Sequence, residues 1–169
     1  MSTRQILVIG VGGTGKSYIV NCLHPRGIPA FDADSVPGLA QFVDRNGCAV
    51  DFPRSADEQW LAQHTFQWVD LALDQLLATH PTLYLCGMAD NMFDFLDRFD
   101  QVYHLRATHD LLLQRLTHPA RQNWLGETAA QRRFVLRQND MLEQQVALRG
   151  IPSVDAALSP AAIYEQIRR

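Results

Sequence analysis

A glycine-rich segment near the N-terminus restricts the possible folds of this chain more than any other feature. Residues 6–9 (ILVI) are typical of a buried β-strand, and the segment GVGGTGKSY follows them at residues 10–18. This segment matches two patterns, the G-x-G-x-x-G of a dinucleotide-binding Rossmann unit and the G-x-x-x-x-G-K-[ST] of a P-loop. In both patterns the glycines lie between a strand and a helix, and the helix N-terminus binds phosphate groups. The segment therefore predicts a nucleotide site on an α/β fold.

Several observations favour the P-loop over the dinucleotide pattern. Lys16 is expected at the start of the helix, where the helix dipole is unfavourable for a cation unless the cation reaches a bound phosphate. Of the 15 Lys and Arg residues, Lys16 is the only lysine, and Ser17 follows it with the hydroxyl that ligates Mg²⁺ in a P-loop. With 169 residues, the chain is too short to add a hydride-transfer domain of the usual kind. We therefore interpret residues 10–17 as a P-loop, with a Rossmann loop or a glycine turn without a ligand as the alternatives.

Composition and charge are those of one globular domain without nucleic-acid or membrane partners. Hydrophobic residues make up 47% of the chain and charged residues 20%, and the formal net charge of −3 argues against duplex nucleic acid as a partner. The apolar runs are strand-sized, well below the roughly 18 residues of a membrane span. Three separated cysteines without a C-x-x-C pair favour a reducing compartment, and no signal-peptide pattern opens the chain. We therefore expect a single domain over residues 1–169, located in the cytoplasm as a monomer or homodimer.

Strand and helix signals alternate along the chain and predict a parallel sheet with helices on both faces. The predicted strands are residues 5–9, 27–31, 82–86, 101–106 and 150–155. The predicted helices are residues 16–24, 38–45 after Pro37, 55–78 after a capping box at Ser55, a segment after Thr108, 128–149 after a second capping box, and a segment after Ser159. On the helix over residues 55–78, Trp60, His64 and Trp68 would share one face, as a half-buried stripe or as a pocket wall.

Two carboxylates follow the second predicted strand. Asp32 and Asp34 lie at its carboxyl end, which in a parallel sheet is on the same edge as the glycine loop. Because residues two apart on an extended segment point the same way, both carboxylates can face one site. One could hold water around Mg²⁺, and the other could accept a hydrogen bond from an acceptor hydroxyl. The alternative for Asp34 is that it caps a following turn.

With these motifs assembled, the chain resembles the small P-loop kinases of the adenylate kinase and shikimate kinase group. GVGGTGKS at residues 10–17 and DAD at residues 32–34 stand in the order and spacing that shikimate kinases show, and dephospho-coenzyme A kinases carry a similar DAD. The resemblance implies an α/β fold, the three-layer α/β/α P-loop NTPase fold, with a parallel five-stranded sheet in the order 2-3-1-4-5. It also implies ATP and Mg²⁺ as cofactors, a small-molecule acceptor, and a short lid at about residues 117–127.

The resemblance also assigns roles at the phosphate and metal sites. Lys16 would contact the β- and γ-phosphates, and Ser17 would ligate Mg²⁺. Asp32 would lie near the metal, and Asp34 near the acceptor hydroxyl. Ser17 and Asp32 are therefore the implied metal-binding residues.

Two arginines complete the implied site. Arg115 matches the arginine that packs against adenine before the lid, and Arg121 matches a lid arginine that stabilises charge on the transferred phosphoryl group. The implied catalytic residues are Lys16, Asp34 and Arg121. The implied nucleotide-binding residues are Gly10, Val11, Gly12, Gly13, Thr14, Gly15, Lys16, Ser17, Tyr18 and Arg115.

The sequence departs from these kinases on the acceptor side. No arginines match those that bind the shikimate carboxylate, although Arg45 and Arg54 lie in the right part of the chain. The third predicted strand ends at Gly87 rather than in a Walker B aspartate, which Asp90 could replace through water. Two carboxylates favour a hydroxyl over a phosphate acceptor, so we expect transfer of the ATP γ-phosphoryl group to a metabolite hydroxyl. A nucleoside or nucleotide kinase, and a nucleotide-binding module or slow ATPase that regulates a partner, are the alternatives.

Overall fold

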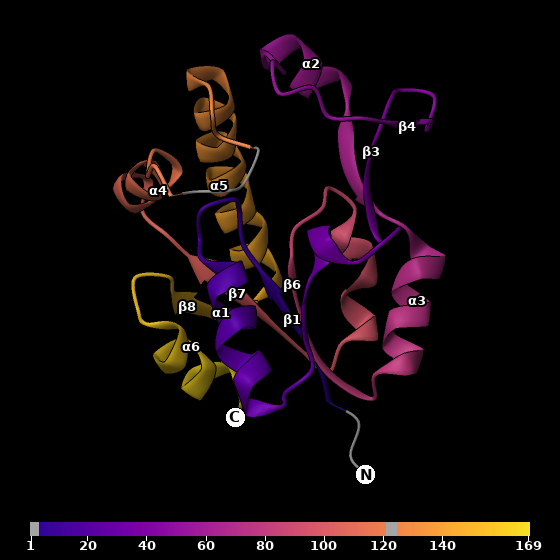
Figure 1. Ribbon diagram of the computed structural model, residues 1–169, viewed down its shortest axis with the longest axis vertical. Helices are drawn as coiled ribbons and strands as arrows, with labels where there is room; N and C mark the ends of the chain where they lie inside the picture. Colours follow the sequence, from indigo (N-terminus) through magenta and orange to yellow (C-terminus); the bar gives the residue numbers. More distant parts are fainter. Residues whose placement is uncertain (1–3, 121–124) are drawn as a thin grey trace.

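The fold is built around a parallel sheet (Figure 1). A computed structural model of the protein describes residues 4–120 and 125–169. Its main sheet has five strands in the order β2-β6-β1-β7-β8, and the order is the predicted 2-3-1-4-5, so the expected fold class is confirmed. The strands are β1 (Arg4–Ile9), β2 (Ala30–Asp32), β6 (Thr82–Gly87), β7 (Gln101–Arg106) and β8 (Ser153–Asp155).

The middle strand β1 places the glycine loop at the centre of the sheet edge. It pairs with β6 along its whole length, from Arg4 opposite Thr82 to Ile9 opposite Gly87, and with β7 on its other side. The side chains of residues 6–9 are fully buried. A strand covered on both faces needs apolar side chains at successive positions, which explains the ILVI run.

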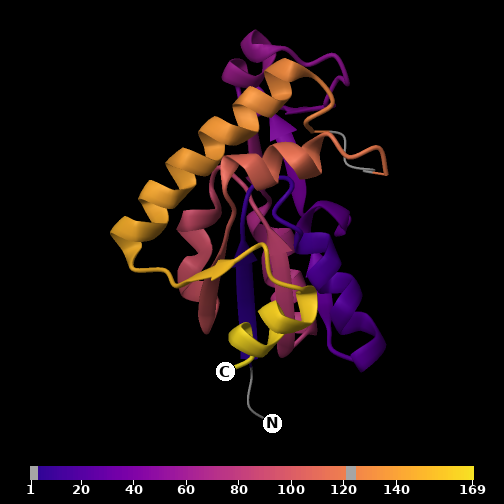
Figure 2. The same ribbon diagram turned by 90° about the vertical axis from the view of Figure 1, so that its left-hand side faces the viewer.

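Helices cover both faces of the sheet. α1 and α6 pack against each other on one face, and the long helix α5 lies on the opposite face (Figure 2). The predicted caps are confirmed, because the side chains of Thr108, Thr128 and Ser159 each accept a backbone N–H three residues ahead. The helices of the main domain are α1 (Lys16–Leu23), α3 (Asp70–Thr79), α4 (His109–Leu116), α5 (Ala129–Arg149) and α6 (Pro160–Ile167), with 3₁₀ turns η1 (His24–Arg26), η2 (Ala33–Ser35) and η3 (Met92–Arg98).

Two strands begin three residues later than predicted. β2 begins at Ala30 instead of residue 27, and β8 at Ser153 instead of residue 150. The reason is the same at both places, because Gly27 and Gly150 end the preceding helices with φ of 67° and 64°. Glycine adopts this left-handed conformation without steric cost, so it terminates a helix instead of starting a strand.

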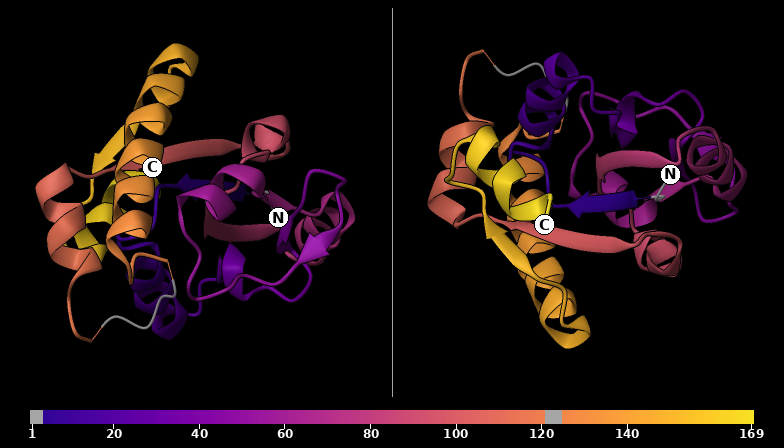
Figure 3. Two further views of the ribbon diagram at one scale, coloured as in Figure 1. Left: turned by 90° about the horizontal axis from the view of Figure 1, so that it is seen from above. Right: turned by 90° about the horizontal axis from the view of Figure 1, so that it is seen from below.

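A second, antiparallel sheet stands above the carboxyl edge of the main sheet (Figure 1; Figure 3, left). It contains β3 (Ala40–Val43), β4 (Ala49–Val50) and β5 (Thr65–Trp68) in the order β4-β3-β5, and α2 (Glu58–Gln63) lies between β4 and β5 in the chain. We call residues 40–68 the antiparallel cap.

The helix predicted over residues 38–45 is wrong, because this segment forms β3. Gly38 has a φ of 74°, which a helix interior does not accommodate. The carboxylate of Asp44 then accepts the backbone N–H groups of Asn46 and Cys48 at 2.8 and 2.9 Å. These bonds stabilise a tight turn that folds β4 back onto β3.

The helix predicted over residues 55–78 is also wrong, because β5 interrupts it between α2 and α3. α2 is capped by Asp57, which accepts the N–H of Trp60, and not by the predicted Ser55. Residues 65–68 (TFQW) contain a β-branched threonine and aromatic side chains at the alternate positions 66 and 68, a composition that favours a strand. Trp60 and His64 therefore stay together with stacked rings 4.0 Å apart, whereas Trp68 lies on β5 opposite Ala40.

No helix in the described parts of the chain is long and apolar enough to span a lipid bilayer.

Candidate functional site

The glycine loop is a compact turn between β1 and α1. Gly13 and Gly15 have φ of 93° and 97°, so both need the freedom of glycine. Thr14 is buried, and its hydroxyl donates to the carbonyl of Val11 at 2.9 Å. Gly15 is the N-cap of α1, and no side chain caps that helix. The helix N-terminus is thus open to an anion at the edge of the sheet.

Lys16 lies against the mouth of this loop. Its ammonium donates to the carbonyls of Gly10 at 2.6 Å and Val11 at 3.0 Å. These contacts hold the positive charge beside the N-terminus of α1, where the helix dipole opposes it. The arrangement brings a cation to the same point as the exposed helix end, as binding of a phosphate chain requires.

Ser17 in the first turn of α1 and Asp32 at the end of β2 are in contact. The Ser17 hydroxyl donates to one oxygen of Asp32 at 2.6 Å. The other oxygen of Asp32 accepts the backbone N–H of Asp34 at 3.2 Å, so Asp32 caps the turn η2, which contains Asp34. A hydroxyl and a carboxylate fit Mg²⁺, which takes oxygen ligands and usually keeps waters and phosphate oxygens as well.

Asp34 faces a cleft that also contains the glycine loop. Asp34 keeps an exposed surface, but the protein packed around its carboxyl removes water from it and raises its pKa to about 6 from the ordinary 3.8. The charge of Lys16 opposes this rise in pKa, and the charge of Asp32 adds to it. A carboxyl with this pKa is ionised near pH 7 and still basic enough to take a proton.

The cleft has walls from four parts of the molecule. The glycine loop and η2 form one end, the antiparallel cap forms a second wall, α5 with the segment before it forms a third, and the segment after β6 forms a fourth. The lining residues are Gly12, Lys16, Asp34, Phe42, His64, Phe66, Met88, Ala89, Asp90, Leu125, Phe134 and Gln138.

Comparison with known proteins identifies the fold. No family model matches the chain, and neither does any curated protein. The chain is similar to a shikimate kinase from Acinetobacter baumannii in complex with shikimate, with a TM-score of 0.60 and 13% identity over 99% of this chain and 92% of that chain. It is also similar to a gluconokinase from Sinorhizobium meliloti 1021, with a TM-score of 0.53 and 18% identity over 98% and 90%. A deoxyadenosine kinase from M. mycoides with bound dATP gives a TM-score of 0.50 and 15% identity over 97% of each chain. The chain has the fold of the small P-loop kinases.

Arg115 is bound to the P-loop itself. From the last turn of α4, its guanidinium donates to the carbonyls of Thr14 at 3.0 Å and Gly13 at 3.4 Å. It also donates to the carbonyl of Ala156, just after β8, at 2.8 Å. Arg115 therefore joins the P-loop to the neighbouring loop of the sheet edge, and its packing against adenine stays a prediction.

The lining of the cleft does not include Tyr18, Arg45 or Arg54, which were also considered for the site. Tyr18 is 71% exposed on α1 and belongs to the solvent-facing side of that helix. Arg121 lies outside the described residues, as does part of the lid predicted at 117–127. Arg45 and Arg54 are exposed, and neither belongs to the lining of the cleft.

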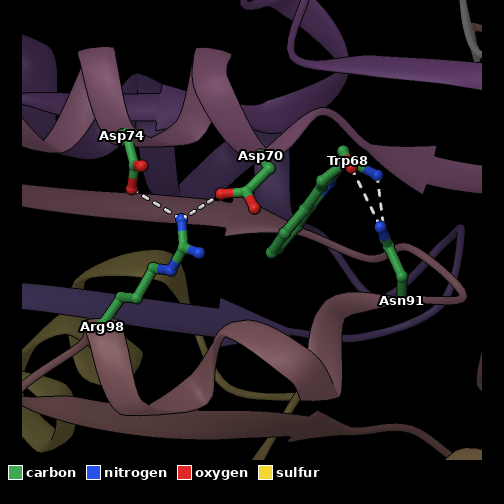
Figure 4. Close-up of polar contacts among 5 residues, drawn as sticks. All are labelled: Trp68, Asp70, Asp74, Asn91 and Arg98. Carbon is green, nitrogen blue, oxygen red and sulfur yellow. Dashed lines mark hydrogen bonds and ion pairs between the residues drawn. The ribbon is translucent and has the colours of Figure 1, made fainter.

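Asp90 and Asn91 dock the antiparallel cap onto the end of β6. A carboxylate oxygen of Asp90 accepts the N–H of Phe66 at 2.7 Å, while the Asp90 N–H donates to the Phe66 carbonyl at 2.7 Å. The Asn91 side chain pairs with both backbone groups of Trp68, at 2.8 and 2.9 Å (Figure 4). Burial raises the pKa of the Asp90 carboxyl, and the Phe66 N–H opposes that rise. Asp90 thus holds the edge of β5 as well as lining the cleft.

Gly87 explains why the strand before Asp90 does not end in an aspartate. A Cβ atom at this position would lie 2.5 Å from the Cβ of Ala33 and 3.0 Å from the Trp68 ring. The backbone of β6, the turn η2 and the cap approach each other too closely there for any side chain. A Walker B carboxylate at residue 87 is therefore incompatible with the way the cap is docked.

Sequence reasoning missed the residues of α5 that complete the site. Phe134 and Gln138 line the cleft, four residues apart on the same helix face. Gln131, one turn earlier, is fully buried, and its carbonyl accepts the N–H groups of Gly126 and Glu127, both at 3.0 Å. The sequence predicted the capping box that begins this helix. It did not predict that the face with Phe134 and Gln138 lines the cleft, because that depends on how the cap docks.

Proposed function

We propose that the protein is a kinase that transfers the γ-phosphoryl group of ATP to a hydroxyl group of a small molecule. The observation that carries the proposal is the shared cleft, which Lys16 of the P-loop and the carboxyl of Asp34 line together. Phosphoryl transfer needs a cation at the donor phosphates and a group that orients the attacking hydroxyl. The fold shared with a shikimate kinase and a gluconokinase supports the same class of reaction.

On the donor side, the P-loop would hold the phosphate chain against the N-terminus of α1. Lys16 would exchange its bonds to the Gly10 and Val11 carbonyls for bonds to the β- and γ-phosphate oxygens. Arg115 would pack against the adenine ring beside the P-loop that it already contacts. Arg121 would approach the transferred group from the lid.

Ser17 and Asp32 are the residues that would hold Mg²⁺, because their oxygens already meet at 2.6 Å at the edge of the sheet. The ion, when bound, supplies positive charge that neutralises the phosphate oxygens during transfer.

On the acceptor side, Asp34 would accept a hydrogen bond from the acceptor hydroxyl and take its proton. The hydroxyl oxygen forms the new bond to the γ-phosphorus, and the bond from that phosphorus to the bridging oxygen of ADP breaks. ADP leaves with the electron pair of the broken bond. The proton resides on the Asp34 carboxyl until it passes to solvent, which the pKa of about 6 permits near neutral pH.

The substitution Asp34→Asn tests this proposal. The amide keeps the size of the side chain but cannot take a proton, so kcat should fall about 100-fold or more while the Kd for ATP changes little. The matched control is Asp94→Asn, an exposed carboxyl on η3 outside the cleft, which should leave both values unchanged. Retention of wild-type kcat by Asp34→Asn would remove Asp34 from the reaction.

A further inference from the structure

The acceptor half of the cleft is aromatic. Phe42 on β3 and Phe66 on β5 line it from the cap, with ring centroids 4.9 Å apart. Phe42 is backed by the rings of Phe52 at 5.3 Å and Trp60 at 5.1 Å. Phe134 of α5 lines the same cleft from a different element. These contacts pack the rings of the cap against one another, so the cleft has an aromatic wall against which an unsaturated ring can pack.

Among the residues that the structure describes, no lysine or arginine lines this half of the cleft. Among the described lining residues, Lys16 is the only lysine or arginine, and it lies at the P-loop end. Asp34 and Asp90 line the cleft as well. An acceptor with its own carboxylate or phosphate would therefore meet two acidic groups, an arrangement that disfavours anions.

Two arginines that precede Phe134 on α5 are engaged elsewhere. Arg132 donates to the carbonyls of Gly126 and Glu127 at 3.0 and 2.9 Å. Arg133 forms an ion pair with Glu58 of α2 at 2.9 Å. Neither of these guanidinium groups belongs to the cleft lining.

The remaining polar groups are those that recognise neutral ligands. His64 Nδ1 lies 2.7 Å from the carbonyl of Trp60, so it must carry the proton and donate, and in the neutral ring Nε2 is then an acceptor. Gln138 offers one amide acceptor and two donors. Both residues line the cleft beside the aromatic rings, where they can bind hydroxyl, amide or ring-nitrogen groups.

We propose that the acceptor is an uncharged alcohol that carries a flat, unsaturated ring. The ring would stack on the aromatic walls from Phe42, Phe66 and Phe134, and the hydroxyl would reach Asp34. This inference rests on the proposed kinase function and narrows its acceptor to a neutral, ring-bearing class.

An acceptor panel tests this assignment. ADP release is measured with neutral ring-bearing alcohols (nucleosides and pyridoxine), with neutral alcohols without an unsaturated ring (glycerol and ribose), and with anions (shikimate, gluconate and nucleoside monophosphates). Mass spectrometry of the product confirms each phosphorylation. We expect kcat/KM for the best ring-bearing alcohol to exceed that of every other compound at least tenfold.

The outcomes separate the two proposals. Highest kcat/KM with an anion or a ringless alcohol would overturn the acceptor assignment and leave the kinase function in place. Failure of every compound to raise ADP release, with ATP binding intact, would overturn both.

A substitution in the aromatic wall supplies a second test. Phe66→Leu keeps the backbone groups that pair with Asp90 but removes the ring, so KM for the ring-bearing acceptor should rise about five- to tenfold. KM for ATP should change less than twofold. The control Phe93→Leu removes a ring outside the cleft that packs under Arg149, and it should not alter KM for the acceptor. An equal rise in both KM values for Phe66→Leu would contradict stacking.

Discussion

The P-loop and the antiparallel cap both line the cleft, but contacts of different range hold them. In the P-loop, Thr14 bonds to Val11 and Lys16 bonds to Gly10, which are three and six positions away. The cap depends on Asp90, which holds Phe66 across 24 positions. Apart from the bonds of Arg115 to the Gly13 and Thr14 carbonyls, the P-loop is therefore held by its own residues, whereas the docking of the cap depends on residues distant in the chain.

The difference in the range of these contacts matches a difference in what the P-loop and the cap would bind. Every nucleoside triphosphate presents the same phosphate chain, and a short loop of fixed geometry can bind it. The acceptor is the part that differs between kinases of one fold, and function on a shared fold resides in such grafted sites. In this protein the cap supplies Phe42, His64 and Phe66 to the cleft that Lys16 also lines.

The largest expected effect is on the P-loop side. Lys16→Ala removes the ammonium from the cleft and should lower kcat/KM for ATP by about 100- to 1,000-fold, the loss seen when one group that stabilises transition-state charge is removed. Because its contacts are local, the melting temperature should change little. Steady-state kinetics and thermal unfolding of the same sample check both expectations.

Lys16→Arg is the matched control for this change. Arginine keeps the charge but places a planar fork where a compact ammonium reaches the Gly10 and Val11 carbonyls, so activity should recover only in part. Wild-type activity in Lys16→Ala would show that the P-loop has no part in transfer.

The next effect tests the cap through Gln131. This fully buried side chain accepts N–H groups of the turn before α5, and it donates to the carbonyl of Arg54 at 3.0 Å, 77 positions away in the chain. Gln131→Leu leaves these groups without partners and should lower the free energy of unfolding by about 3 kcal/mol. Hydrogen exchange should rise across residues 40–68 and stay unchanged in residues 10–17.

The substitution Gln131→Glu separates the acceptor role of the Gln131 side chain from its donor role. Its carboxylate still accepts the N–H groups of Gly126 and Glu127 but no longer donates to Arg54. Exchange should therefore rise in the cap near Arg54 and remain low at residues 126–128. Equal protection of the cap in the wild type and Gln131→Leu would refute its dependence on this contact.

The same difference in contact range decides how much the sequence predicts. The strand over residues 6–9, the glycine loop and the caps at Thr108, Thr128 and Ser159 depend on neighbours within a few positions, and the structure contains all of them. The order of the main sheet also follows, because a strand buried on both faces and joined through helices is restricted to few arrangements.

The cap shows where prediction from local pattern fails. Its strands β3 and β5 contain four residues each, too few for a periodic signal, and the sequence around Trp60 also suits a helix. Phe66 becomes part of a strand because it pairs with Phe42 of β3 while Asp90 bonds to both of its backbone groups. The aromatic wall and the contribution of Phe134 were therefore inaccessible from the sequence alone.

Asp34 lines the cleft together with the P-loop and the cap, and its ionisation should give a smaller, pH-dependent effect on kcat/KM. Only its ionised form can take the acceptor proton, so kcat/KM should fall about tenfold for each pH unit below its pKa of about 6 and level off above it. A pH profile of the wild type checks this, with Asp34→Asn as the flat reference. A wild-type profile without a break near pH 6 would contradict the assignment of the base.

The stability of the protein should change with pH in the opposite sense. The folded pKa of Asp34 lies above its ordinary value of 3.8, so between about pH 4 and 6 the unfolded chain loses this proton first. The resulting penalty on folding grows through that range and is fully present above pH 6. Asp34→Asn should therefore raise the melting temperature relative to wild type at pH 8 and lose this advantage at pH 4. A constant difference between the two would show that burial of the charge is not its cause.

The smallest effect compares a contact that holds the cap with ion pairs between η3 and α3 (Figure 4). Asn91→Ala removes the pairing with both backbone groups of Trp68 and should cost about 1 kcal/mol of unfolding free energy, with a raised KM for the acceptor. Arg98→Ala removes ion pairs at 2.6 Å to Asp70 and Asp74, whose side chains are 65% and 60% exposed. Exposed pairs contribute little, so this change should cost about 0.5 kcal/mol and leave KM unaltered. Urea unfolding of both variants measures the two losses of unfolding free energy. A larger loss for Arg98→Ala would show that surface ion pairs stabilise this region more than the bonds to the backbone of β5 do.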